Sequence, residues 1–307
     1  MLLKGVIPAN ILPLDDDLRI DEAAYREHLQ SLVDVDGVAG VTCNGHAAEV
    51  SSLDLVERRR ALAIAVETVA GRVPVISGLF AHDERDALEQ ARSAVETGAD
   101  ALLVFPPEFL HYSDDPAAPQ RYLTLLAETV SIPLVAFMYP DFTGLRYSFE
   151  QLAAVCAIDN VVAVKDWSLD IAAYERNLEI AGAAPHNVSL LSSFSTHLLP
   201  ALSVGGDGIL SGHGSVIAPL QVDLFRAVQR GDLEASRTAY ARIQMLTRVV
   251  YRSPMPNMYA RMKEQLVMLG YAMSTRVRAP LRQVSEEERR SLRHALERAG
   301  LLPREQR

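Results

Sequence analysis

Short runs of apolar, largely β-branched residues recur along the chain, and segments with helical periodicity lie between them. The runs predict eight buried strands, at residues 5–10, 38–42, 73–78, 101–105, 134–137, 161–165, 188–191 and 208–210. Between the second and third runs, Leu55, Leu62, Val66 and Val69 return at the spacing of one helix face, and Gly71 is expected to end that helix. The chain therefore repeats a strand–helix unit.

Parallel strands that are joined by helices form either a closed barrel or an open, doubly wound sheet. Eight units fit a (β/α)8 barrel, which takes roughly 250 residues. The glycine-rich dinucleotide fingerprint of a Rossmann domain is missing after the first strand. The pattern thus predicts an α/β protein with a (β/α)8 TIM barrel that carries the catalytic site over residues 1–225.

The pattern changes after the eighth strand, where helices follow one another without strands. The expected helices lie at residues 232–251, 254–270 and 285–300. Ser285 followed by three glutamates is typical of a helix start, and Gly300 with Pro303 is typical of a helix end. Residues 226–307 are therefore predicted to form a C-terminal helical extension.

Composition narrows the classes of partner. The 307 residues are 49% hydrophobic, and 30 Lys and Arg against 39 Asp and Glu give a net charge of −9. An acidic chain without basic runs lacks the footprint of a nucleic-acid binder or of a protein held on anionic lipid. No apolar stretch is long enough to span a membrane, and Cys43 and Cys156 lack zinc or redox spacing. We expect a cytoplasmic protein that binds a small molecule.

Lys165 is the most informative polar residue, because it ends the otherwise apolar run 161–165. Active sites of such barrels lie at the carboxyl ends of the strands. A lysine among buried strands is desolvated, which lowers its pKa and makes the neutral amine a nucleophile toward a carbonyl. The alternative is a structural lysine that reaches solvent or pairs with Asp166.

A loop of small residues follows the second strand. In Asn44-Gly45-His46-Ala47-Ala48-Glu49, the small residues let backbone N–H groups approach a ligand. His46 either moves protons or is a hydrogen-bonded loop histidine, and the pattern favours neither. Glu49 is expected to accept backbone donors or orient a neighbour, and Cys43 to pack in the core.

Glycines also surround the eighth strand, in residues 205–215, and Ser211 stands among them. Barrels often bind anions at the loops after strands seven and eight, so this segment is expected to contact a carboxylate or a phosphate. A phosphate-binding barrel isomerase is one alternative that the glycines leave open. The histidines His111, His197 and His213 lack metal-ligand spacing, so neither a metal nor another cofactor is expected.

Several ordered motifs resemble the dihydrodipicolinate synthase / N-acetylneuraminate lyase family over nearly the whole chain. They are the opening at residues 5–9, the segment 71–78, the strand to Lys165 and the glycines at 205–208. The resemblance implies a barrel with a helical extension, usually a tetramer, whose lysine forms a Schiff base with pyruvate or another 2-oxo acid. It assigns that role to Lys165. A protonated imine allows carbon–carbon or carbon–oxygen bond cleavage beside the former carbonyl.

The chain departs from the family pattern at the positions that move protons and bind the second substrate. The family loop Gly-Thr-Thr-Gly-Glu is residues 45–49 here, without its threonines, and Phe137 stands where the family has its catalytic tyrosine. Tyr139, on the same side of the strand, or His46 is the expected substitute. Phe142 replaces an arginine after Pro140, and residues 105–110 lack the tyrosine that reaches into a neighbouring subunit.

Together these features predict a class I lyase, either an aldolase or a dehydratase, with Lys165, Tyr139 and His46 as catalytic residues. The expected substrate-binding residues are Gly45, Ala47, Ala48, Phe137, Phe142 and Ser211. The expected substrates are a 2-oxo acid and an aldehyde or hydroxy acid that is less charged than the synthase's second substrate. The expected assembly is a homotetramer, built as a dimer of dimers. The alternative is a non-catalytic barrel that binds a 2-oxo acid after losing its proton relay.

Overall fold

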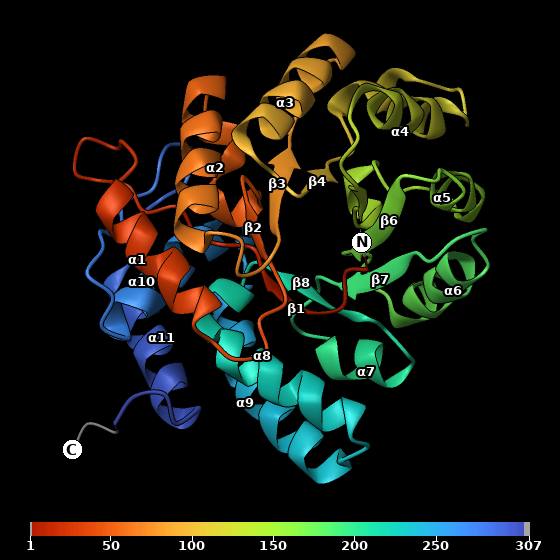
Figure 1. The fold of residues 1–307 in the computed structure, drawn as a ribbon. Helices are drawn as coiled ribbons and strands as arrows, with labels where there is room; N and C mark the ends of the chain where they lie inside the picture. The colour runs from red at the N-terminus through yellow and green to blue at the C-terminus, as the bar shows by residue number, and fades with distance from the viewer. Residues whose placement is uncertain (1, 304–307) are drawn as a thin grey trace.

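The computed structural model describes residues 2–303, which form a barrel of eight parallel strands with helices around it (Figure 1). The strand order is β1-β8-β7-β6-β5-β4-β3-β2. Bridges from Val6 to Val38 and from Ala9 to Thr42 join the two ends of the sheet. The sheet therefore closes into the predicted (β/α)8 barrel.

Every predicted apolar run contains a strand. The strands are β1 (Gly5–Pro8), β2 (Val41–Cys43), β3 (Val75–Leu79), β4 (Ala101–Val104), β5 (Leu134–Met138), β6 (Val161–Asp166), β7 (Ser189–Ser192) and β8 (Gly208–Ser211). The largest difference is in β2, which begins at Val41 because Val38 makes only the isolated bridge to Val6. Lys165 lies in register with Phe137 on β5 and Leu191 on β7.

The outer helices follow the strands in turn. They are α1 (Glu22–Val33), α2 (Leu55–Val69), α3 (Glu84–Thr97), α4 (Ala118–Thr129), α5 (Phe149–Cys156), α6 (Ile171–Gly182), α7 (Leu198–Ser203) and α8 (Gly214–Gln229). Aspartate side chains cap the amino ends of α1, α2, α3 and α6 by accepting backbone N–H groups. At the end of α2, Ala70 takes the left-handed cap position one residue before the expected Gly71.

Three helices follow the barrel, as predicted: α9 (Leu233–Val250), α10 (Met258–Met268) and α11 (Glu286–Arg298). Ser285 and Glu288 form a capping box at the start of α11. A short turn, η5 (Met255–Asn257), precedes α10, so the long helix begins later than residue 254. The domain boundary expected at residue 225 falls inside α8, which packs along α9.

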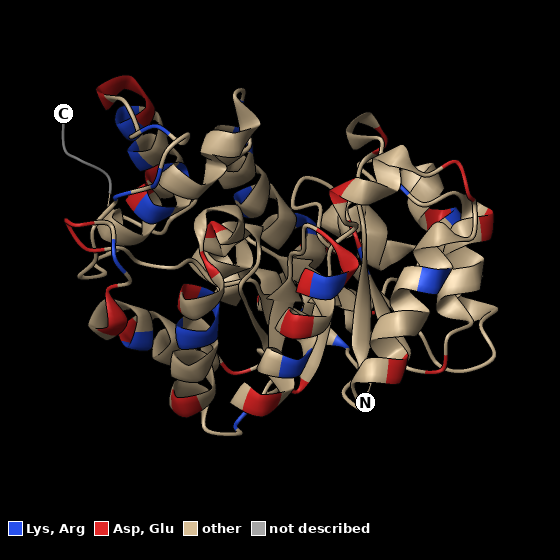
Figure 2. Ribbon diagram, turned by 90° about the horizontal axis from the view of Figure 1, so that it is seen from above, with Lys and Arg blue, Asp and Glu red and all other residues tan. Residues whose placement is uncertain are grey.

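The barrel interior is a packed core. Its buried side chains include Ile7, Leu103, Val135, Phe137 and Leu191, and a larger apolar group fills the space between the strands and the helices. Acidic and basic residues are interspersed over the helices (Figure 2). None of the helices in residues 2–303 combines the length and apolar character required to cross a bilayer. Cys43 and Cys156 are free and buried.

Candidate active site

Lys165 lies inside the barrel near the carboxyl end of β6, with 4% of its surface exposed. Its Nζ is 3.9 Å from the centroid of the Phe137 ring on the neighbouring strand. Asp166, the next residue, instead accepts hydrogen bonds from the Ser168 N–H at 2.7 Å and from Asn177 Nδ2 at 2.6 Å. Among the described residues, no carboxylate pairs with Lys165. The alternative of a structural lysine that reaches solvent or pairs with Asp166 is therefore not what the structure shows.

Burial decides the protonation of Lys165. Desolvation lowers the pKa of its amine to about 7, because an ammonium ion without a counter-ion is costly in an apolar interior. At neutral pH, roughly half of the molecules then carry the free amine. A neutral amine is the form that attacks a carbonyl carbon.

His46 and Tyr139 form a hydrogen-bonded pair beside the lysine. His46 Nε2 and the Tyr139 hydroxyl are 2.7 Å apart. Burial, followed by the nearby charge of Lys165, lowers the pKa of His46 to about 3, so the imidazole is neutral. Burial also raises the pKa of the Tyr139 phenol, which stays protonated. Depending on its tautomer, the imidazole accepts from or donates to the phenol, so a proton can pass in either direction.

Aromatic rings surround this pair. Ring centroids in the cluster lie 4.8 to 6.4 Å apart, mostly edge to face. The members are His46, Phe80, Phe105, Phe137, Tyr139 and Trp167. Such a shell keeps water away from the amine, which accounts for the lowered pKa of Lys165.

A small cavity opens beside Lys165, with a volume of about 40 Å³. Of the residues expected from the sequence, His46, Ala47, Phe137 and Lys165 line it. The sequence analysis missed the other large contributors, which are Trp167, Ser193, Tyr251, Met258, Tyr259 and Met262. Four of these come from the end of α9 and from α10, so the extension builds part of the cavity wall.

The loop after β2 presents Ala47 to the cavity. The short turn η1 (His46–Ala48) follows Gly45, which is its N-cap. The N–H groups of Ala48 and Glu49 close the turn on the carbonyls of Gly45 and His46, at 3.0 and 2.9 Å. In the described part of the chain, this leaves the Ala47 N–H without a partner.

Five expected residues do not line the cavity, namely Tyr139, Gly45, Ala48, Ser211 and Phe142. Ala48 is buried as the last residue of the turn η1. Ser211 is fully buried, where its hydroxyl contacts Ser195 Oγ at 2.9 Å and accepts from Gln221 at 3.2 Å, and its neighbour Gly212 reaches the cavity instead. Phe142 lies on the turn η4 (Asp141–Thr143) with 70% of its surface exposed.

Glu49 joins the loop to the extension. Its carboxylate accepts from Lys263 Nζ at 2.5 Å and from the Arg278 N–H at 3.0 Å. The side chains of Lys263 and Glu49 are 0% and 3% exposed. The expected orienting role of Glu49 thus acts on α10, across 214 residues of sequence.

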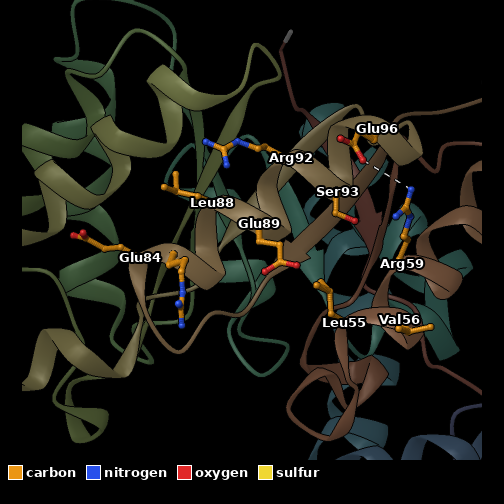
Figure 3. A pocket seen from close by; sticks show the side chains of 10 residues that line it. Leu55, Val56, Arg59, Glu84, Leu88, Glu89, Arg92, Ser93 and Glu96 are labelled. Atoms are coloured by element: carbon orange, nitrogen blue, oxygen red, sulfur yellow. Dashed lines mark ion pairs between the residues drawn. The ribbon is translucent and has the colours of Figure 1, made fainter.

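A larger groove, of about 740 Å³, lies on the outside of the barrel between α2 and α3 (Figure 3). Acidic and basic side chains line it, and Arg59 pairs with Glu96 across it at 3.8 Å. Lys165 and the aromatic cluster are not part of it. Within residues 2–303, no three His, Cys, Asp or Glu side chains are grouped so that they could hold a metal ion.

The sequence profile of the dihydrodipicolinate synthetase family matches residues 2–299. The 4-hydroxy-tetrahydrodipicolinate synthase of Methanopyrus kandleri is 34% identical over 309 residues, which cover 98% of each chain. An uncharacterized DapA-like lyase of Halobacterium salinarum is 31% identical over 300 residues, which cover 98% of this chain and 95% of the relative.

Solved structures of the same family have the same fold. A prophage protein of the dihydrodipicolinic acid synthase family from E. coli K12, in complex with pyruvate, superposes with a TM-score of 0.90 at 25% identity over 98% of this chain and all of that one. The dihydrodipicolinate synthase of Aquifex aeolicus gives a TM-score of 0.88 at 25% identity, over 97% and 99% of the two chains. The predicted resemblance is confirmed, and the chain belongs to the dihydrodipicolinate synthetase family of lyases.

Proposed function

We propose that this lyase works through a Schiff base between Lys165 and pyruvate or another small 2-oxo acid. The observation that carries the proposal is the buried, unpaired amine, whose pKa of about 7 leaves much of it neutral beside a cavity. The amine adds to the keto carbon, and loss of water from the adduct leaves the imine. The pyruvate bound to the related E. coli protein supports a 2-oxo acid of this size.

The His46–Tyr139 pair supplies the proton transfers that follow. Once protonated, the imine acts as an electron sink. In an aldolase, the carbon–carbon bond one carbon beyond the imine carbon breaks, its electron pair forms the enamine, and the departing alcohol loses its hydroxyl proton to the neutral imidazole as it becomes an aldehyde. In a dehydratase, the imidazole removes a proton from the carbon next to the imine, and the resulting enamine expels the hydroxyl group, which keeps the electron pair of its bond and takes that proton back to leave as water. Tyr139, whose hydroxyl is 2.7 Å from His46 Nε2, positions the imidazole for these transfers.

The cavity lining supports a second substrate that carries little charge. Lys165 is the only lysine or arginine among the residues that line the cavity. A second carboxylate would therefore be buried among rings without a counter-ion, at a cost of several kcal/mol. We propose an uncharged aldehyde or hydroxy compound as the acceptor or leaving fragment.

The test is turnover on a panel of 4-hydroxy-2-oxo acids, including sugar-derived ones, with release of pyruvate or formation of the dehydrated oxo acid as the readout. The protein should process at least one compound, and Lys165→Ala should abolish that activity. Lys4→Ala is the matched control, because Lys4 is half exposed and pairs with Asp207 at the opposite end of β1 and β8. Equal turnover in wild type and Lys165→Ala would contradict the proposal.

The non-catalytic barrel stays as the second candidate, because Phe137 and the threonine-free loop depart from the family pattern. It predicts that a 2-oxo acid binds while every compound of the panel is left unchanged. Turnover of one of them would exclude it.

We also propose a cytoplasmic homotetramer, built as a dimer of dimers. The two buried free thiols are consistent with a reducing compartment. Tyr112 and Phe142 are 92% and 70% exposed, on the turns η3 (Glu108–Tyr112) and η4. Because His111 of η3 lies against Gly144 beside η4, the two exposed rings belong to adjoining turns and support an interface there.

A further inference from the structure

The C-terminal extension brings hydroxyl groups to the Lys165 cavity. Met258, Tyr259 and Met262 stand on one face of α10 and line the cavity, together with Tyr251 at the end of α9. Ser193, directly after β7, completes this part of the wall. The loop of Gly45 to Glu49 itself carries no hydroxyl.

Two of these hydroxyls lack partners. Tyr251 contacts Ser195 Oγ at 3.3 Å. By contrast, the hydroxyls of Tyr259 and Ser193 make no hydrogen bond to any residue of the part that the structure describes. Burial, with Tyr251 and Glu49 nearby, raises the pKa of Tyr259, so its phenol remains a donor. Hydroxyls that border a cavity without a protein partner are free to donate to a ligand bound there.

The position of Tyr259 is fixed. Lys263 lies one helical turn further along α10 and forms the buried ion pair with Glu49. Its Nζ also donates to the Arg276 carbonyl at 2.7 Å. Because Glu49 ends the loop that carries His46 and Ala47, the pair holds α10 against that loop.

A carboxylate in this cavity needs hydrogen-bond donors. The amine of Lys165 is consumed in the imine, and no other cation lines the cavity. Tyr259, Ser193 and Ala47 line the same small cavity as Lys165. The two unpartnered hydroxyls and the Ala47 N–H therefore border the space that a 2-oxo acid on Lys165 enters.

We propose that Tyr259 and Ser193 bind the carboxylate of the 2-oxo acid on Lys165, and so select acids over plain ketones. This inference rests on the proposed Schiff-base function and adds the residues that recognise the acid group. It makes the extension part of the substrate site.

The experiment traps the imine with borohydride and measures the half-saturating concentration of pyruvate, and separately of acetone, which has no carboxylate. Tyr259→Phe and Ser193→Ala should each raise the value for pyruvate by about ten- to hundredfold, the usual effect of losing a hydrogen bond to a charged group. Acetone should be trapped equally well by wild type and by both variants. Tyr271→Phe, which loses a phenol contact of 3.0 Å to Ser31 outside the cavity, is the control that should leave both values unchanged.

An unchanged pyruvate value in Tyr259→Phe and Ser193→Ala would overturn the assignment and leave the Schiff-base function intact. Equal losses with pyruvate and acetone would also overturn it, because a general distortion of the site affects both ketones. If wild type traps neither ketone, the Schiff-base function fails, and the assignment falls with it.

Discussion

The chain has three lysines, and their surroundings separate their roles. Lys4 is half exposed and lies 3.9 Å from Asp207. Lys263 is fully buried and neutralised by Glu49. Lys165 is equally buried, but in the described chain it has an aromatic ring where Lys263 has a carboxylate. Burial lowers the pKa of both amines, and Lys165 differs from Lys263 in having no carboxylate counter-ion.

This difference predicts a pH dependence. The rate of adduct formation with pyruvate should rise as pH passes through about 7 and level off above about 8, because deprotonation of Lys165 supplies the neutral amine. His46, with its pKa lowered to about 3, stays neutral over this pH range, so its titration does not change the rate of adduct formation. The measurement is the initial rate of cyanoborohydride trapping from about pH 5 to about pH 9. A rate that still rises about tenfold per pH unit at about pH 9, as expected for a lysine with the ordinary pKa of about 10.4, would contradict the account.

Tyr139→Phe keeps the ring and removes the hydroxyl that meets His46 at 2.7 Å. Turnover should fall by roughly a hundredfold or more, the usual contribution of a positioned proton carrier, while pyruvate is still trapped on Lys165. Steady-state kinetics on the compound of the panel that is turned over fastest measures the loss of turnover. Borohydride trapping on the same preparation measures whether pyruvate still binds to Lys165. Unchanged turnover would assign the proton transfers to another group.

At the scale of elements, the strands could be predicted because each buried run is bounded by turn residues. Phe80, Phe105, Tyr139 and Trp167 directly follow β3 to β6, one aromatic residue after each strand. The aromatic cluster could therefore have been predicted from the sequence, from one aromatic residue after each of these four strands.

The part that α10 plays in the cavity wall could not be predicted in this way. Contact between Lys263 and Glu49 depends on how segments 214 residues apart meet in space.

The ion pair between α10 and the loop predicts a coupling in stability. Lys263→Met leaves the buried Glu49 carboxylate without its counter-ion and should lower the free energy of unfolding by about 3–5 kcal/mol. Adding Glu49→Gln removes the stranded charge, so the double variant should recover much of this loss. Urea unfolding of wild type, both singles and the double variant measures the coupling. Additive losses would show that the two residues act independently.

At the scale of the whole molecule, barrel closure gathers the carboxyl ends of the strands around Lys165, and residues of the extension form one wall of the cavity. The eight-strand count and the helical tail were sufficient to predict the barrel and its extension, but not that the extension lines the cavity. The proposed assembly rests on the family resemblance and on the exposed rings of Tyr112 and Phe142.

Sedimentation equilibrium at micromolar concentration should give a particle of about four times the 33.7 kDa chain. The double substitution of Tyr112 and Phe142 by serine removes apolar area from adjoining turns and should shift the particle toward smaller species. A monomer in wild type would exclude the tetramer, whereas a tetramer that resists both substitutions would place the interface elsewhere.

The most direct test of the central claim is to locate the bound carbon. The protein is incubated with pyruvate, reduced with borohydride, digested and examined by peptide mass spectrometry, which is simple because only three peptides contain lysine. The account predicts a reduced pyruvate adduct on the Lys165 peptide and none on the peptides of Lys4 or Lys263. Absence of an adduct with pyruvate and with larger 2-oxo acids, or an adduct only on another lysine, would contradict it.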